Sequence, residues 1–91
     1  MSPSLTNGAR LVITSEQIRA ARAMLRWEQK TLAEESKVSL ATVKRIEGKP
    51  SPAIANRPTI DSLSRALESA GVIFVEENGE GPGVRLRKAT K

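Results

Sequence analysis

Apolar residues recur three and four positions apart in four short segments of this 91-residue chain. That spacing places them on one face of an α-helix, with polar residues on the other. Gly48, Pro50 and Pro52 prevent the third segment from continuing, and Gly71 stands where a helix end favours a left-handed residue. We therefore expect a mainly α fold, with helices over about residues 16–27, 29–36, 40–47 and 60–70.

Hydroxyl side chains precede three of these four segments. Thr14 or Ser15 can accept hydrogen bonds from the free N–H groups of a first helical turn. Thr14 with Gln17 three positions on fits a capping box, in which each residue bonds the backbone of the other. Ser39 and Thr59 are expected to cap the third and fourth helices in the same way.

The spacing of the apolar residues changes after Gly71. Val72–Val75 is β-branched and aromatic and predicts a strand, and the alternation over Val84–Arg87 predicts a second, half-buried strand. Both faces of the first strand are apolar, and one of them can cover the helices. We expect the tail of a second copy to cover the other, with a hairpin folded back on its own helices as the alternative. The expected dimerisation residues are Val72, Ile73, Phe74, Val75, Val84 and Leu86.

The composition excludes most enzyme classes as the function of this chain. The chain has no cysteine and no histidine, so the usual thiolate and imidazole metal sites and the common nucleophilic triads cannot be built. We expect no enzymatic activity, no metal and no cofactor. No apolar run approaches the roughly 18 residues that span a bilayer, and residues 1–10 lack the features of a signal peptide. The expectation is a cytoplasmic protein without a membrane partner.

The positive charge is concentrated where the helices are expected. The net charge is +5, and the excess lies in the first two-thirds of the chain, which favours a polyanionic partner. Two short helices at 29–36 and 40–47, joined by a tight turn, are typical of a helix-turn-helix, whose second helix lies in the major groove of DNA. A generic helical bundle has the same apolar spacing and is the alternative. Val43 and Ile46 would face the core, leaving Leu40, Ala41, Lys44 and Arg45 outward.

The stretch from Gln29 to Glu47 carries the pattern Q-x-x-L-A, then V-S, then V-x-x-I-E. This pattern resembles the lambda-repressor-like helix-turn-helix family, the group of phage Cro and cI repressors and xenobiotic-response-element regulators. The resemblance covers about residues 13–71 and implies a four-helix DNA-binding domain there, between a flexible arm at 1–12 and a β-hairpin dimerisation tail at 72–91. The chain departs from the family at Lys37, where glycine is usual, at Gly48, which follows Glu47 directly, and in the long proline-rich loop after it.

The resemblance also implies roles for particular residues. Arg22 and Glu47 match a buried ion pair that ties the first helix to the end of the third. Gln29 matches a residue that touches a DNA phosphate and supports the reading helix. Arg45 is the best candidate to read a base, because a guanidinium can bond guanine O6 and N7 together. The full set of expected DNA-binding residues is Gln29, Lys30, Ser39, Leu40, Ala41, Thr42, Lys44, Arg45, Lys49 and Arg57.

These observations favour a sequence-specific transcriptional regulator, a repressor by analogy, that binds palindromic double-stranded DNA as a homodimer. An antitoxin is the alternative: it would repress its own operon and bind a toxin through Val72–Val75 and the tail. A third alternative is a protein-interaction module that has lost DNA binding, against which the exposed Lys44 and Arg45 argue.

Overall fold

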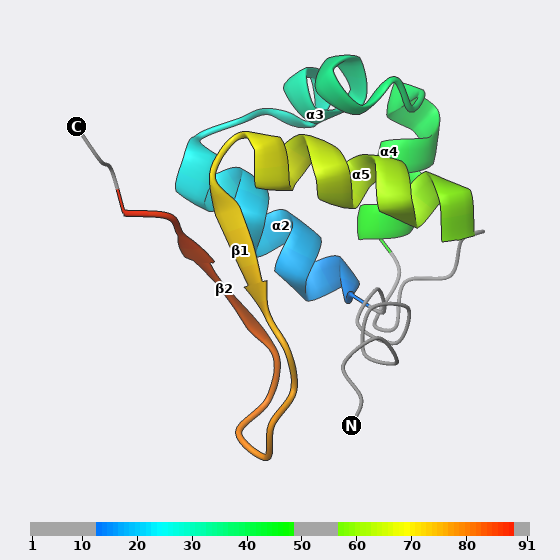
Figure 1. Ribbon diagram of the computed structural model, residues 1–91. Coiled ribbons are helices and arrows are strands. Elements are labelled where there is room, and N and C mark those ends of the chain that lie inside the picture. Colours follow the sequence, from blue (N-terminus) through cyan, green and yellow to red (C-terminus); the bar gives the residue numbers. More distant parts are fainter. Residues whose placement is uncertain (1–12, 49–56, 89–91) are drawn as a thin grey trace.

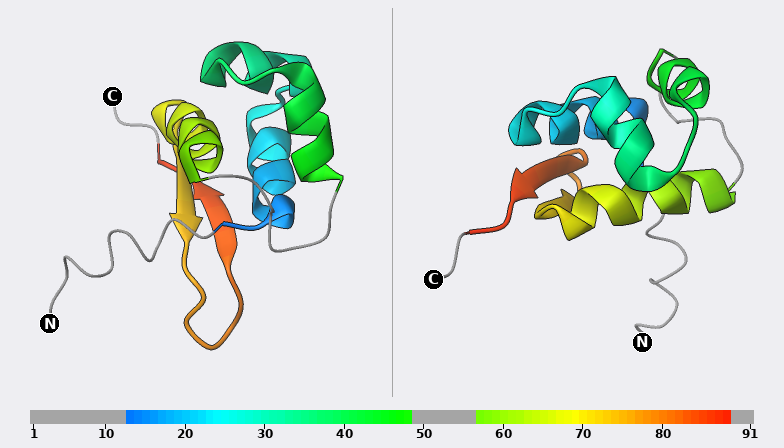
Figure 2. Two further views of the ribbon diagram at one scale, coloured as in Figure 1. Left: turned by 90° about the vertical axis from the view of Figure 1, so that its right-hand side faces the viewer. Right: turned by 90° about the horizontal axis from the view of Figure 1, so that it is seen from above.

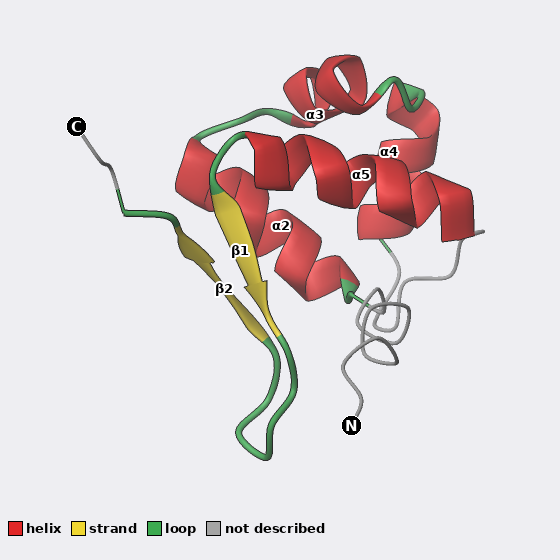
Figure 3. Ribbon diagram, viewed as in Figure 1, coloured by secondary structure: helices red, strands yellow, loops and turns green. Residues whose placement is uncertain are grey.

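The computed structural model describes residues 13–48 and 57–88, which form four α-helices and one antiparallel pair of strands (Figures 1 and 3). The prediction of a mainly helical fold with a small strand pair after the helices is confirmed. The arm expected at 1–12 lies outside these residues. The elements are α2 (Ser15–Leu25), α3 (Gln29–Ser36), α4 (Leu40–Glu47), α5 (Arg57–Ser69), β1 (Val72–Val75) and β2 (Gly83–Leu86).

The core is aliphatic, and each described element except β2 contributes a fully buried side chain or one nearly so. Burying one such side chain contributes about 1.5–3 kcal/mol relative to leaving it exposed. Trp27 and Phe74 pack against the edge of this core rather than filling it. The fully buried large side chains are Ile18, Leu32, Val43, Ile46, Leu63, Leu67 and Val72.

The first helix begins with the predicted capping box. The Thr14 hydroxyl accepts from the Gln17 N–H at 3.0 Å, and the Thr14 N–H donates to Gln17 Oε1 at 2.9 Å. The helix ends at Leu25 rather than at Trp27 as predicted. Arg26 adopts the left-handed conformation (φ 60°) and donates its N–H back to the last turn, which stops the helix without glycine.

The last helix begins earlier than predicted. We expected Thr59 to cap a helix from Ile60, but α5 starts at Arg57 and includes Thr59. Pro58 lies in the first turn, where backbone N–H groups have no partner within the helix, so proline is tolerated there. β2 is likewise displaced by one residue from the predicted Val84–Arg87 and spans Gly83–Leu86.

The two strands pair within one chain and form a hairpin against the helices. The register is Val72↔Leu86, Ile73↔Arg85, Phe74↔Val84 and Val75↔Gly83. Figure 2 shows β1 beside α5 and β2 beside α2. Val72 is fully buried, and Phe74 and Val84 pack on the same core, so these three expected dimerisation residues contact their own helices. Ile73 and Val75 are half-buried, and Leu86 is exposed.

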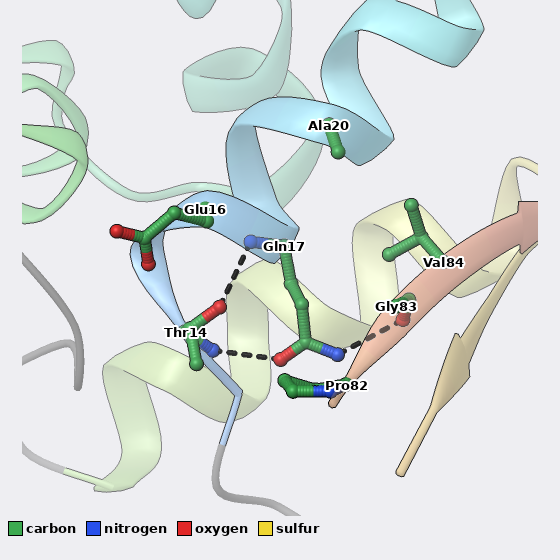
Figure 4. Close-up of a pocket in the computed structure, with 7 residues that line it drawn as sticks. All are labelled: Thr14, Glu16, Gln17, Ala20, Pro82, Gly83 and Val84. Carbon is green, nitrogen blue, oxygen red and sulfur yellow. Dashed lines mark hydrogen bonds between the residues drawn. The ribbon is translucent and has the colours of Figure 1, made fainter. Parts of the chain in front are cut away.

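Gln17 joins the hairpin to the helices. Its side chain is nearly buried, and its amide Nε2 donates to the carbonyl of Gly83 at 2.9 Å, while its Oε1 completes the capping box (Figure 4). One side chain therefore fixes the start of α2 and the start of β2 together. The sequence indicated its first role, but nothing local indicated the second.

Candidate nucleic-acid interface

Three residues, 37–39, connect α3 to α4. Lys37 adopts the left-handed conformation (φ 65°), in which most side chains are strained. The N–H of Val38 donates to the carbonyl of Ala33 at 3.2 Å and approaches the Ser36 hydroxyl at 3.3 Å. The tight turn therefore forms even though the chain has lysine where glycine was expected from the resemblance.

The N-terminal end of α4 is capped and open to solvent. The exposed Ser39 hydroxyl accepts from the Thr42 N–H at 3.1 Å, and the same hydroxyl donates to the Thr42 side-chain oxygen at 2.9 Å. The cap satisfies one of the free N–H groups at this end of the helix. The remaining free N–H groups and the helix dipole make this end attractive to an anion.

One face of α4 is buried and the opposite face is exposed. Val43 and Ile46 are fully buried, whereas Ala41, Lys44 and Arg45 are exposed. Leu40 was expected to face outward with them, but it is half-buried and packs against the core. The exposed face of α4 consequently offers one small side chain and two positive charges.

The C-terminal end of α4 is held by α2 through an ion pair. Glu47 is buried, with its side chain 3% exposed, and the Arg22 side chain is 20% exposed. The Arg22 Nε donates to Glu47 Oε2 at 2.7 Å and one of its terminal nitrogens donates to Oε1 at 2.8 Å. This two-bond geometry orients both groups and compensates for their removal from water. The other terminal nitrogen of Arg22 donates to the Trp27 carbonyl.

Three further side chains hold the same end of α4. The Gln29 amide donates to Glu47 Oε1 at 3.0 Å, the Ser15 hydroxyl donates to the Ile46 carbonyl at 3.0 Å, and Arg19 donates to the Glu47 carbonyl. Two of these bonds satisfy carbonyls of the last turn, which have no partner within the helix. Sequence reasoning missed Ser15 and Arg19, because their partners lie 31 and 28 residues away.

Gln29 therefore supports α4 directly. It is half-buried, and its amide nitrogen is engaged with Glu47. Of the remaining expected DNA-binding residues, Lys30 on α3 and Arg57 at the start of α5 are exposed, and Thr42 is half-buried. Lys49 lies outside the described residues.

Within residues 13–48 and 57–88, no group of acidic side chains is arranged to hold a metal ion. No helix in the same part of the chain is long and apolar enough to cross a membrane. Comparison with family models and with curated protein sequences finds no match to this chain.

Proposed function

We propose that this protein is a sequence-specific DNA-binding transcriptional regulator, acting as a repressor. In this proposal α3 and α4 form a helix-turn-helix of the lambda-repressor-like type, and α4 enters the major groove. The observation that carries the proposal is the two-sided character of α4: Lys44 and Arg45 are exposed on one face, while the other face and the C-terminal end are fixed by buried contacts.

Rigid support of α4 is what base reading requires. A side chain discriminates between bases only if its donors reach the base edge in one geometry, because a displaced helix makes looser bonds to every base. Arg45 would donate hydrogen bonds to guanine O6 and N7, and Ala41 would contact a thymine methyl group. Lys44 would bond guanine or a phosphate, and Ser39 would bond a phosphate beside the start of the helix.

One reading helix covers only a few base pairs, which is too little to select one site in a genome. The proposal therefore includes a homodimer that reads two half-sites about 34–36 Å apart on a palindrome. Such a regulator works in the compartment that holds the DNA, which we take to be the cytoplasm. The proposed role needs no catalytic activity and no cofactor.

The test is selection of binding sites from a pool of randomised duplexes, followed by fluorescence-anisotropy titration of the enriched site and a shuffled duplex. We expect an enriched palindrome. Arg45→Ala should reduce the preference for it roughly 5- to 150-fold for each half-site, equivalent to the about 1–3 kcal/mol of one two-bond base contact. Arg65→Ala on α5 is the matched control, since it removes the same exposed side chain from another helix.

Two results would contradict the proposal. The pool could yield no enriched sequence, with enriched and shuffled duplexes losing binding together as salt rises, which is the behaviour of a non-specific positive surface. Alternatively, Arg45→Ala and Arg65→Ala could reduce the preference equally, in which case α4 is not the reading helix.

A further inference from the structure

The loop between β1 and β2 carries an asparagine followed directly by a glycine, Asn78 and Gly79. Figure 1 shows this loop extending away from the helices, and both residues are exposed. Asparagine is a chemically labile residue, because a backbone nitrogen can attack the carbon of its side-chain amide. Glycine in the next position leaves that nitrogen unhindered, since it has no Cβ. The chain can therefore react with itself at this pair.

The conformation of the pair depends on the glycine. Gly79 has a φ of 106°, in the region that residues other than glycine rarely adopt. A Cβ built at this position would meet no atom within 4 Å, so the surroundings of Gly79 are open. The loop thus presents the pair to water.

The backbone two residues further on holds the side-chain oxygen of Asn78. The Glu80 N–H donates to Asn78 Oδ1 at 3.3 Å, which forms the turn that asparagine side chains commonly make with their own backbone. This turn brings the side-chain amide back toward the peptide unit that joins Asn78 to Gly79. A donor at Oδ1 also stabilises the negative charge that develops on this oxygen when a nucleophile adds to the carbon.

A carboxylate lies against the nitrogen that would attack. The Gly79 N–H donates to Glu77 Oε2 at 2.8 Å, and the Gly81 N–H donates to the same oxygen at 3.2 Å. Two backbone donors therefore fix the carboxylate at the N–H of Gly79. The lone pair of an amide nitrogen is perpendicular to the plane that contains its N–H bond, so this hydrogen bond leaves the lone pair free. Glu77 is thus placed to accept the proton that an attack releases.

We propose that this loop modifies itself: Asn78 loses ammonia through a cyclic imide, with Glu77 as the proton acceptor, and becomes aspartate or isoaspartate. The Gly79 nitrogen forms a bond to Cγ of Asn78 while its proton passes to Glu77, and an electron pair of the Cγ–Oδ1 double bond moves onto Oδ1. The double bond then re-forms, the bond from Cγ to Nδ2 breaks, and the proton passes from Glu77 to Nδ2, which leaves as ammonia. These steps close a five-membered imide ring.

Water opens the ring, and no other co-reactant is needed. Its oxygen adds either to Cγ, which restores the normal backbone and leaves aspartate, or to the backbone carbonyl carbon, which leaves isoaspartate with the main chain running through the side chain. Either product adds one negative charge to a chain of net charge +5. Isoaspartate also lengthens the backbone before Gly79 and so displaces the N–H groups that hold Glu77. This inference is independent of DNA binding.

The experiment incubates the purified chain at neutral pH in heavy-oxygen water and follows the reaction by trypsin digestion and mass spectrometry. The sequence supplies an internal reference, because Asn7 also precedes a glycine but follows a threonine rather than a glutamate. Cleavage after arginine places the two asparagines in different peptides, 1–10 and 66–85. The Asn78 peptide should gain heavy oxygen. The ratio of its rate to that of Asn7 should fall about tenfold when urea unfolds the chain, because unfolding separates the reacting groups.

Two variants of the loop test the role of the carboxylate. Glu77→Gln keeps an oxygen that can accept the two backbone bonds, but its amide is too weak a base to take the proton. It should slow the reaction of Asn78 about tenfold, less than the usual general-base effect of about 10²–10⁴, because Glu77 is exposed to water. Glu80→Gln is the matched control: it removes a carboxylate from the same loop, keeps the backbone N–H that bonds Asn78, and should leave the rate unchanged.

Three results would overturn the inference. The first is an unmodified Asn78 in a chain whose Asn7 has reacted. The second is a native rate, relative to Asn7, at or below the rate in urea, since the fold would then protect the pair. The third is a Glu77→Gln variant that reacts as fast as Glu80→Gln or faster, since Glu77 would then not accept the proton. Circular dichroism of both variants checks that the helices are intact, so that a changed rate reports the loop.

Discussion

Removing the Glu47 carboxylate should strongly destabilise the contact between α2 and α4. The carboxylate accepts three hydrogen bonds, two from Arg22 at 2.7 and 2.8 Å and one from Gln29 at 3.0 Å. Glu47→Ala would leave a guanidinium and an amide without that partner in a site from which water is largely excluded.

The size of the effect follows from the burial of the two partners. Breaking a buried ion pair by removing one member costs about 3–5 kcal/mol. The Arg22 side chain is 20% exposed and keeps its bond to the Trp27 carbonyl, so we expect the lower end, about 3 kcal/mol. In a domain of this length about 1 kcal/mol shifts Tm by about 4–8 °C, so Tm should fall by about 12–24 °C.

Urea unfolding followed by fluorescence and by circular dichroism measures this free energy. Trp27 is the sole tryptophan, and its carbonyl is bonded to Arg22, so its fluorescence reports the neighbourhood of the ion pair. Circular dichroism reports the helices as a whole. Coincident transitions from the two probes justify a two-state free energy of unfolding.

The double variant Arg22→Met/Glu47→Leu distinguishes a charge effect from a packing effect. Replacing both members by apolar groups of similar size is often close to neutral, so the double variant should lose much less stability than Glu47→Ala. A loss below about 1 kcal/mol for Glu47→Ala would place the pair among exposed salt bridges and refute the reasoning. Additive losses in the Arg22→Met, Glu47→Leu cycle would refute it as well, because contacting charges must show coupling.

Three further outcomes are expected. Gln17→Ala should cost about 1 kcal/mol or more, because half-buried backbone groups of Thr14 and Gly83 lose their partner. Hydrogen exchange should speed up around Gly83 more than elsewhere, and a uniform change would contradict the role of Gln17 in joining the hairpin to α2. Lys37→Gly should raise the free energy of unfolding by up to about 1 kcal/mol. The left-handed conformation costs a residue other than glycine about 1–2 kcal/mol, and the greater chain entropy of glycine in the unfolded state offsets part of this gain. A lower Tm would show that the turn is unstrained. Ser39→Ala should cost about 1 kcal/mol of stability through the lost bond to the Thr42 N–H. Ser39→Asp should keep the stability and weaken DNA binding. Equal DNA binding by Ser39→Asp and wild type would remove Ser39 from the proposed interface.

Local patterns in the sequence determined the elements of this fold. The capping box of Thr14 and Gln17, the periodic apolar residues and the left-handed Gly71 each depend on neighbours within one helical turn. Such features can be read without knowing how the helices pack, because the atoms that interact are close in the chain. For the same reason the elements were predicted more accurately than their ends. Arg26 ends α2 with no local signal that pointed to it, and α5 begins at Arg57, where Pro58 was a usable signal for a first helical turn.

Only the tertiary structure decided which side chains hold α4 in place. Ser15 and Arg19 bond carbonyls of α4 that lie 31 and 28 residues away, and no spacing rule connects such distant positions. The bond from Gln17 to the Gly83 carbonyl, 66 residues away, fixes the hairpin in the same way. Packing also moved Leu40 from the expected exposed face to the edge of the core. The sequence by itself thus determined the helices and the charge they carry. Their packing determined which of those charges are largely buried as structural partners, as in Arg22, and which stay exposed, as in Arg45, because burial depends on the approach of a second element.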